Sequence, residues 1–247
     1  MANVQIYPDP EHLAQAAAEQ FVHIAETAIH ARGVFTVALS GGTTPQMLFR
    51  LLASDPYIHK VDWSNTHIFW GDERCVPPDN EESNYFKAKE TLLDHIQIPE
   101  ANIHRILAEL PPEQAAEDYE ENLLKFFSAL QDETERTQAQ FDLVLLGMGD
   151  DGHTASLFPG TPAIHEVTHW VAAQYIDKLA AWRITLTPAI LNRAANIIFL
   201  VAGPAKGYAL QKVLYGPYQP DRYPAQIIAP QQGSLLWMVD EPAASLF

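Results

Sequence analysis

The chain has 247 residues, and its 47% hydrophobic and 19% charged content excludes a disordered protein. The formal net charge of -16 argues against a nucleic-acid-binding or anionic membrane surface, because both need clustered Lys and Arg. If the ligand is itself an anion, the few basic residues must gather at its site. One cysteine, Cys75, excludes an internal disulfide framework and is typical of a reducing compartment.

The amino-terminal segment MANVQIYPDPEHLAQAAAEQ lacks the basic flank and the apolar core of a signal peptide. No apolar run approaches membrane-spanning length, so we expect a cytoplasmic protein. The length fits one large α/β domain or two small ones, and we favour a single domain that comprises residues 1–247.

Strands and helices are predicted to alternate along the chain. A short edge strand is expected at Val4 to Tyr7, and Asp9-Pro10-Glu11 predicts the start of a long helix that Gly33 ends. Further strands are predicted at residues 34–39, 66–70, 102–106, 170–175, 180–186, 196–201 and 234–239. Further helices are predicted at residues 46–53, 85–96 and 111–130 and before Tyr215, with a surface loop at 218–230. This alternation indicates an α/β fold with a parallel or mostly parallel sheet covered on both faces.

A loop of glycines and hydroxyls follows the strand at residues 34–39. Its sequence is Ser40-Gly41-Gly42-Thr43-Thr44-Pro45, and a helical segment begins at Gln46. Glycines let backbone N–H groups point into a concavity, and a helix amino terminus adds partial positive charge, so we expect phosphate to bind. The alternative is a tight turn capped by Thr43 or Thr44. No Gly-Lys-Ser/Thr follows, so neither a dinucleotide nor a nucleoside triphosphate is indicated.

The strand at residues 66–70 runs into GDERCVP at 71–77, which we interpret as a loop. Asp72 and Arg74 lie two residues apart and face the same way, and we expect both at a site. For Glu73 a solvated salt bridge is the preferred interpretation. Cys75 beside these charges could act as a nucleophile, but no cysteine-enzyme signature surrounds it, which favours a small buried filler.

The segment Phe141 to Gly160, FDLVLLGMGDDGHTASLFPG, begins as a buried strand and turns into a polar loop. Three glycines allow positive φ or a close approach to a ligand: Gly147, Gly149 and Gly152. Three ionisable residues crowd into the same turn: Asp150, Asp151 and His153. The carboxyl ends of strands in α/β sheets are where ligands bind, which favours a functional site. The alternative is a solvated turn in which an aspartate caps a short helix over Thr154 to Phe158.

Two basic residues further along the chain also favour an anion site. Arg183 lies in the middle of an apolar strand, where a charge is costly unless it meets a partner or an anion. Lys206 lies in the first turn of a helix, where a cation is unfavourable with the helix dipole. A bound anion accounts for both, while simple solvent exposure is the alternative for Lys206.

Five motifs in this order resemble the 6-phosphogluconolactonases, and together they cover nearly the whole chain. They are SGGTTP at 40–45, GDERCVP at 71–77, GMGDDGHTASLFPG at 147–160, RITLT at 183–187 and GPAKG at 203–207. The resemblance implies a three-layer αβα fold with a mostly parallel, Rossmann-like sheet of the glucosamine-6-phosphate deaminase and ribose-5-phosphate isomerase type. It also implies hydrolysis of 6-phospho-D-glucono-1,5-lactone to 6-phospho-D-gluconate, the second step of the oxidative pentose phosphate pathway.

The resemblance implies no cofactor and no metal, and the expected partner is a small-molecule sugar-phosphate lactone. Neither a nucleic acid nor a membrane is expected as a partner, and the protein is expected to be a monomer or a small homo-oligomer. A metal held by His153, Asp72 and Asp151 has weak support, because these three ligands are scattered over two loops.

The chemistry of lactone opening assigns roles to these residues. His153 is expected to take the proton from the attacking water, because the ordinary pKa of imidazole suits a base near neutrality, with Asp151 or Asp72 orienting its ring. Arg74 or backbone amides of the glycine loop would stabilise the oxyanion, and phosphate binding is the alternative for Arg74. The substrate phosphate is assigned to Ser40, Gly41, Gly42, Thr43, Thr44, Arg183 and Lys206.

Two rival functions differ from this one. Glucosamine-6-phosphate deaminases share the SGG loop and the GxGxDGH core, but they continue with Ala-Phe-Asn-Glu-Pro, whereas this chain has Thr154 to Pro159 and lacks that glutamate. A non-catalytic sugar-phosphate sensor of the kind found in transcription regulators would need a DNA-reading module. Neither a basic segment nor a spare amino-terminal helical domain is visible here.

Overall fold

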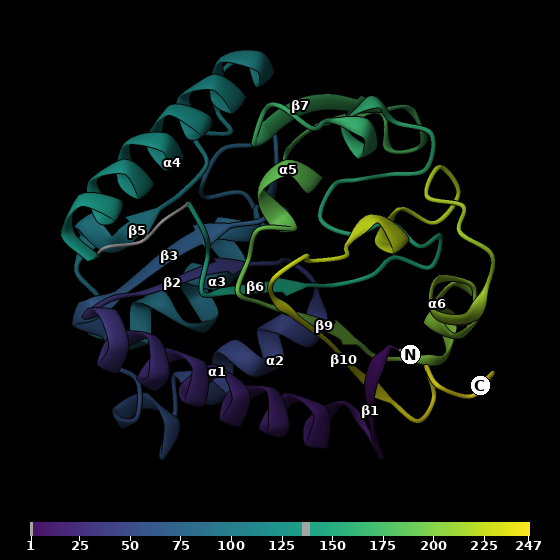
Figure 1. Ribbon diagram of the computed structural model, residues 1–247, viewed down its shortest axis with the longest axis horizontal. Coiled ribbons are helices and arrows are strands. Elements are labelled where there is room, and N and C mark those ends of the chain that lie inside the picture. Colours follow the sequence, from purple (N-terminus) through teal and green to yellow (C-terminus); the bar gives the residue numbers. More distant parts are fainter. Residues whose placement is uncertain (1, 135–138) are drawn as a thin grey trace.

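The computed structural model describes residues 2–134 and 139–247 and is built on a seven-stranded sheet (Figure 1). All of its neighbouring strands are parallel. In spatial order they are β1 (Asn3–Tyr7), β10 (Ser234–Asp240), β9 (Asn196–Val201), β6 (Leu143–Leu146), β2 (Phe35–Leu39), β3 (Thr66–Trp70) and β5 (Ile103–His104). The predicted α/β fold with a mostly parallel sheet is confirmed.

The central strands are apolar because both faces of the sheet are covered. All residues of β2 (FTVAL) and β6 (LVLL) are buried, which explains why their sequences are continuous apolar runs without alternation. The edge strand β1 is largely exposed along its length, and β5 at the other edge has only two residues.

Helices cover the sheet from both sides. Figure 1 shows α1 (Pro10–Arg32) and α2 (Thr43–Leu52) on one face, with α4 (Pro112–Thr134) and α5 (Pro188–Leu191) on the other. The short α3 (Asn84–Thr91) packs against α2, and α6 (Gly207–Tyr215) lies near both chain ends. Among the described helices, none has the length and apolar character that crossing a membrane requires.

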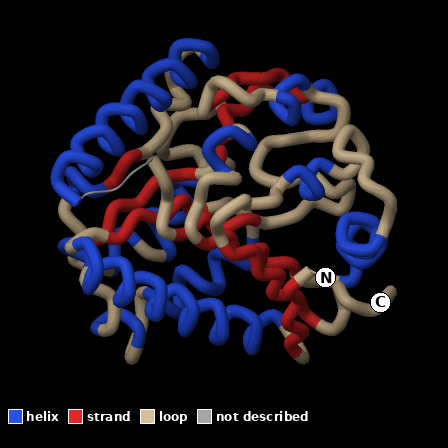
Figure 2. The backbone as a smooth tube through the Cα atoms, in the orientation of Figure 1, coloured by secondary structure: helices blue, strands red, loops and turns tan. Residues whose placement is uncertain are grey.

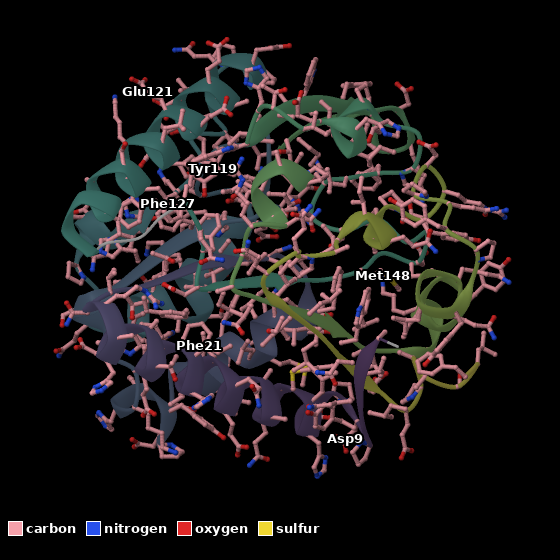
Figure 3. All side chains as sticks on the ribbon, in the orientation of Figure 1. Asp9, Phe21, Tyr119, Glu121, Phe127 and Met148 are labelled. Atoms are coloured by element: carbon pink, nitrogen blue, oxygen red, sulfur yellow. The ribbon has the colours of Figure 1, made fainter. Side chains whose placement is uncertain are left out.

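Helix amphipathicity follows the sequence pattern. In Figure 3, Tyr119 and Phe127 lie on the side of α4 toward the sheet, whereas Glu121 lies on its outer side. Tyr119 is buried, and its hydroxyl accepts from the Trp70 backbone N–H at 2.9 Å, a bond that ties α4 to the end of β3. At the start of α1, Asp9 caps the helix by accepting from the His12 backbone N–H, as predicted.

A second, three-stranded antiparallel sheet lies on the α4 side of the molecule (Figures 1 and 2). Its order is β4 (Asp72–Arg74), β8 (Ala181–Leu186) and β7 (Val171–Ile176). The interpretation of residues 71–77 wholly as a loop was therefore wrong at Asp72–Arg74. Three charged residues carry no hydrophobic alternation, and the pairing with β8 that makes them a strand comes from far along the chain.

Two local expectations were also wrong. Residues 154–158 form no helix; Leu157 instead donates its backbone N–H to the Thr154 carbonyl at 2.9 Å in a tight turn. Within the expected surface loop at 218–230, a short 3-10 helix at Pro224–Ile227 buries Pro224 and Ala225. Asp150 is exposed.

Candidate active site

A cavity of about 220 Å³ opens at the carboxyl edge of the parallel sheet. It lies where the loops after β2, β6 and β9 meet. From β2 the chain continues to β3 and β5 on one side of β2, and it then returns to form β6 on the other side, so the strand order reverses between β2 and β6. Such a reversal of strand order is where open α/β sheets bind ligands. The cavity collects most of the predicted site residues: Ser40, Gly41, Gly42, Thr43, Thr44, Asp72, Arg74, His153 and Lys206.

His153 is held by a carboxylate on one side of its ring. Its Nδ1 lies 2.6 Å from Asp151 Oδ1, and Lys178 Nζ donates to the other carboxylate oxygen at 3.0 Å. Burial alone would raise the pKa of Asp151, but hydrogen bonds from His153 and Lys178 hold it well below its usual range. An ionised carboxylate accepts only, so Nδ1 carries the hydrogen and Nε2 is free to take a proton.

The fold around His153 depends on close packing. Its ring stacks on Phe158 with centroids 4.0 Å apart, and Thr154 Oγ1 donates to the Gly147 carbonyl at 2.8 Å, which closes the loop. A Cβ on Gly149 would lie 2.1 Å from His153 Nδ1, so only glycine leaves room for the ring here. Gly149 is therefore required by the position of the imidazole.

The amino terminus of α2 faces the same cavity. The helix begins at Thr43, and its capping residue Gly42 has φ 106° and supplies no side-chain hydrogen bond. The alternative of a turn capped by Thr43 or Thr44 is therefore wrong. The first backbone N–H groups of a helix have no partner within it, so this end of α2 is suited to an anion.

Two arginines face each other across the small antiparallel sheet. Arg74 of β4 pairs directly with Arg183 of β8, so both side chains lie on the same face of that sheet. Arg74 lines the cavity, whereas Arg183 is not among the lining residues. Burial and the neighbouring Arg74 lower the pKa of Arg183. Like charges directly opposite are unfavourable, and a bound anion would relieve them.

Asp72 and Asn84 form a second polar corner. Asn84 at the start of α3 donates from Nδ2 to the Asp72 backbone carbonyl at 2.9 Å and to its carboxylate at 3.2 Å. Ser156 Oγ donates to the other carboxylate oxygen of Asp72 at 2.6 Å. Sequence reasoning missed Asn84, which only the docking of α3 brings to the cavity.

Glu73 is not in a solvated salt bridge, and that interpretation was wrong. Its side chain is 2% exposed and accepts from the backbone N–H groups of Arg74, Asn84 and Tyr85 and from the Ser83 hydroxyl. Burial raises its pKa, although these hydrogen bonds act to lower it. Glu73 therefore ties the amino terminus of α3 to β4.

Three unpartnered polar atoms mark the cavity as a site for a polar ligand. Within residues 2–134 and 139–247, five buried side-chain polar atoms have no hydrogen-bond partner, and three belong to residues that line this cavity. These three are Ser40 Oγ, Arg74 Nε and Asn84 Oδ1. Each such atom costs about 1–3 kcal/mol when left unpaired, so a ligand that pairs with them binds favourably.

Cys75 and metal ligation receive no support from the geometry. Cys75 is half-buried against the core, and burial raises its thiol pKa to about 11, which leaves no thiolate near neutrality. Across the described ranges, no three His, Cys, Asp or Glu side chains converge as a metal site, so His153, Asp72 and Asp151 do not form a ligand set.

The chain resembles proteins of one family over most of its length. The family model described as glucosamine-6-phosphate isomerases/6-phosphogluconolactonase matches residues 8–237. A 6-phosphogluconolactonase of Synechocystis is 45% identical over 87% of this chain and 86% of that protein. One of Nostoc is 39% identical over 98% of this chain and 97% of that protein.

A solved structure agrees with this assignment. The 6-phosphogluconolactonase of Trypanosoma brucei superposes with a TM-score of 0.85 at 27% identity, over 99% of this chain and 98% of that one. The fold and the sequence together define an α/β protein of the sugar-phosphate isomerase and lactonase type. The chain belongs to the family of glucosamine-6-phosphate isomerases and 6-phosphogluconolactonases.

Proposed function

We propose that this protein hydrolyses 6-phosphoglucono-1,5-lactone to 6-phosphogluconate, as the names of its relatives suggest. The observation in the chain itself that best supports this is the oriented imidazole of His153, whose Nδ1 lies 2.6 Å from the Asp151 carboxylate. This imidazole shares one cavity with a helix amino terminus and two cations, Arg74 and Lys206. A base and an anion grip in one cavity suit an ester that also carries a phosphate.

In this proposal His153 Nε2 takes a proton from a water that attacks the lactone carbonyl carbon. The new C–O bond forms a tetrahedral oxyanion, which then collapses and breaks the bond to the ring oxygen. The protonated imidazole returns its proton to that ring oxygen, which leaves as a hydroxyl. The Asp151 carboxylate stabilises the imidazolium between these two transfers.

Arg74 is the better candidate for the oxyanion. The Gly149 and Gly152 amides already donate to the His153 and Gly149 carbonyls, at 2.8 and 3.1 Å, so they are occupied. Arg74 Nε is buried and has no hydrogen-bond partner in the part of the chain that the structure describes, and its positive charge suits a developing negative oxygen. The phosphate is then assigned to the amino terminus of α2 and its Gly42, Thr43 and Thr44, with Lys206 from the loop after β9 and Arg183, which is paired with Arg74.

A direct assay tests this function. Fresh 6-phosphogluconolactone is supplied, and 6-phosphogluconate is measured with and without protein, because the lactone also hydrolyses spontaneously. We expect a clear excess over the spontaneous rate. Absence of any excess, or release of ammonia from glucosamine 6-phosphate under the same conditions, would contradict the proposal and favour the deaminase chemistry of the same family.

A further inference from the structure

Two buried side-chain oxygens lie at one corner of the cavity, on the lining residues Ser40 and Asn84. Asn84 is 3% exposed and Ser40 is 6% exposed, yet Asn84 Oδ1 and Ser40 Oγ have no hydrogen-bond partner among the described residues. Gly41 separates the two residues, and a Cβ on it would lie 2.0 Å from Asn84 Oδ1. Because Gly41 has no side chain, the Asn84 carboxamide can pack against the loop that contains Ser40. Ser40 and Asn84 both line the cavity.

The orientation of the Asn84 amide is fixed by its partner. Nδ2 faces the Asp72 backbone carbonyl and carboxylate, and both of those groups accept hydrogen bonds. The amide group must therefore point its NH₂ at Asp72 and leave Oδ1 as an acceptor. Asp72 is buried as well, and its other carboxylate oxygen accepts from Ser156.

This chemistry excludes a phosphate and fits hydroxyl groups. Phosphate oxygens are acceptors and carry negative charge, so the Asp72 carboxylate and Asn84 Oδ1 would repel them. Each sugar hydroxyl supplies one donor, which a carboxylate or an amide oxygen accepts, while the Ser40 hydroxyl can either donate or accept. The cations of the cavity, Arg74 and Lys206, are left for the anionic parts of the substrate.

We infer that Ser40, Asn84 and Asp72 form a subsite that binds the ring hydroxyls of the substrate and makes the protein selective for hydroxylated lactones. The inference rests on the proposed function and deepens it. It reassigns Ser40 from binding the substrate phosphate to binding the ring hydroxyls, while Thr43 and Thr44 stay assigned to the phosphate.

The test compares two substrates with the same phosphate and the same six-membered lactone ring. One is 6-phosphogluconolactone, and the other is its 2,3,4-trideoxy analogue, which lacks every ring hydroxyl. A site whose buried groups need a substrate hydroxyl rejects the analogue strongly, so we expect kcat/KM to differ by at least about 10²-fold. In Asn84→Leu, which keeps the side-chain volume, and in Ser40→Ala, we expect this ratio to fall by about tenfold, the effect of one lost hydrogen bond.

Ser83→Ala is the matched control. Ser83 Oγ also supports α3, since it accepts from the Phe86 backbone N–H at 3.1 Å and donates to Glu73 at 2.9 Å, but Ser83 does not line the cavity. This variant should lower the melting temperature and keep the wild-type substrate ratio. Equal hydrolysis of both lactones by the wild type, or a wild-type ratio in both Asn84→Leu and Ser40→Ala, would overturn the subsite. No hydrolysis of either lactone would overturn the proposed function and the subsite with it.

Discussion

Asp151 and Asp72 are the same type of residue with different partners. Asp151 contacts His153 and Lys178, which hold its pKa low, so it stays ionised beside the imidazole. The side chain of Asp72 accepts hydrogen bonds from the neutral donors Asn84 and Ser156, and its charge interacts with that of Arg183. The comparison indicates that the partners of a carboxylate determine what it can do. Asp151 is suited to support proton transfer by His153, and Asp72 is suited to bind neutral hydroxyls.

The two carboxylates also differ in their supporting structure. Asp151 lies on a glycine loop after a parallel strand, where the turn brings it within reach of His153 two residues later. Asp72 lies on β4 of the antiparallel sheet, and its partners come from α3 and from the segment after His153. The site therefore forms where two sheets meet.

Asp151→Asn should have the largest effect of the variants that test this comparison. An asparagine can donate to Nδ1 and so favour the tautomer that has its hydrogen on Nε2, which cannot accept a proton. We expect kcat for the phosphorylated lactone to fall about 10³-fold, within the range for loss of general-base catalysis, while KM changes little. The neighbouring Asp150→Asn is the control, because Asp150 is exposed. Wild-type kcat in Asp151→Asn would remove Asp151 from the mechanism.

Gly149→Ala tests the packing that holds the imidazole. The new Cβ would overlap His153 and also lie 2.7 Å from Asp151 Oδ1, so the pair must move. A displacement on this scale should lower kcat/KM by about 10²-fold. Gly33→Ala serves as the control, because Gly33 ends α1 with φ 73° and open space around it, so only stability should fall. Full activity of Gly149→Ala would show that the position of His153 is not critical.

Lys206→Ala and Arg183→Ala test whether the cations bind the phosphate. A lost charge-assisted hydrogen bond to phosphate should raise KM for 6-phosphogluconolactone by about tenfold or more and barely change hydrolysis of unphosphorylated gluconolactone. Lys212→Ala is the control, because Lys212 lies further along α6 over the ring of Tyr208. Equal losses on both lactones would argue against a phosphate role.

The smallest predicted effect concerns a histidine that has no carboxylate partner among the described residues. Burial and the neighbouring His67 lower the pKa of His104 from 6.5 to about 4. Below pH 6.5, His104 binds a proton in the unfolded chain but stays neutral in the folded protein. Its contribution to the free energy of unfolding is therefore complete above pH 6.5 and is lost as the pH falls toward 4.

His104→Phe should remove part of this loss. His104 already stacks on Phe69 with centroids 4.2 Å apart, so a phenyl ring can keep this stacking, while the contact of His104 Nε2 with His67 Nδ1 at 3.1 Å is lost. Denaturant unfolding should show that the free energy of unfolding falls between about pH 7 and pH 5 by about 1 kcal/mol more in the wild type than in His104→Phe, after a discount for solvent contact of the ring. Identical pH dependence in both proteins would contradict the account of His104.

The sequence predicted the parallel sheet well and the small sheet poorly. Strand β3 has the predicted bounds, and α1 begins and ends near its predicted cap residues, because local composition and capping decide these elements. Asp72–Arg74 was expected to be a loop, and buried Glu73 was expected to be solvated. Both depend on distant segments, β8 for the pairing and α3 for the donors, which no local pattern reveals.

The candidate site shows the same division. Residues in compact loops, such as Thr43 and His153, were identified because glycines and ionisable groups stand together in the sequence. Asn84 was missed, because it follows GDER by ten residues and reaches the cavity only through the docking of α3 on Glu73. The roles assigned to these residues, and the single domain over residues 1–247, stay predictions.

The most direct test of the central claim is the kcat/KM of His153→Asn for 6-phosphogluconolactone, corrected for spontaneous hydrolysis. Asparagine keeps a polar side chain but cannot act as a base near neutrality. We predict a loss of at least about 10³-fold, with binding of 6-phosphogluconate retained because the phosphate and hydroxyl contacts remain. A kcat/KM within threefold of the wild type would contradict the account.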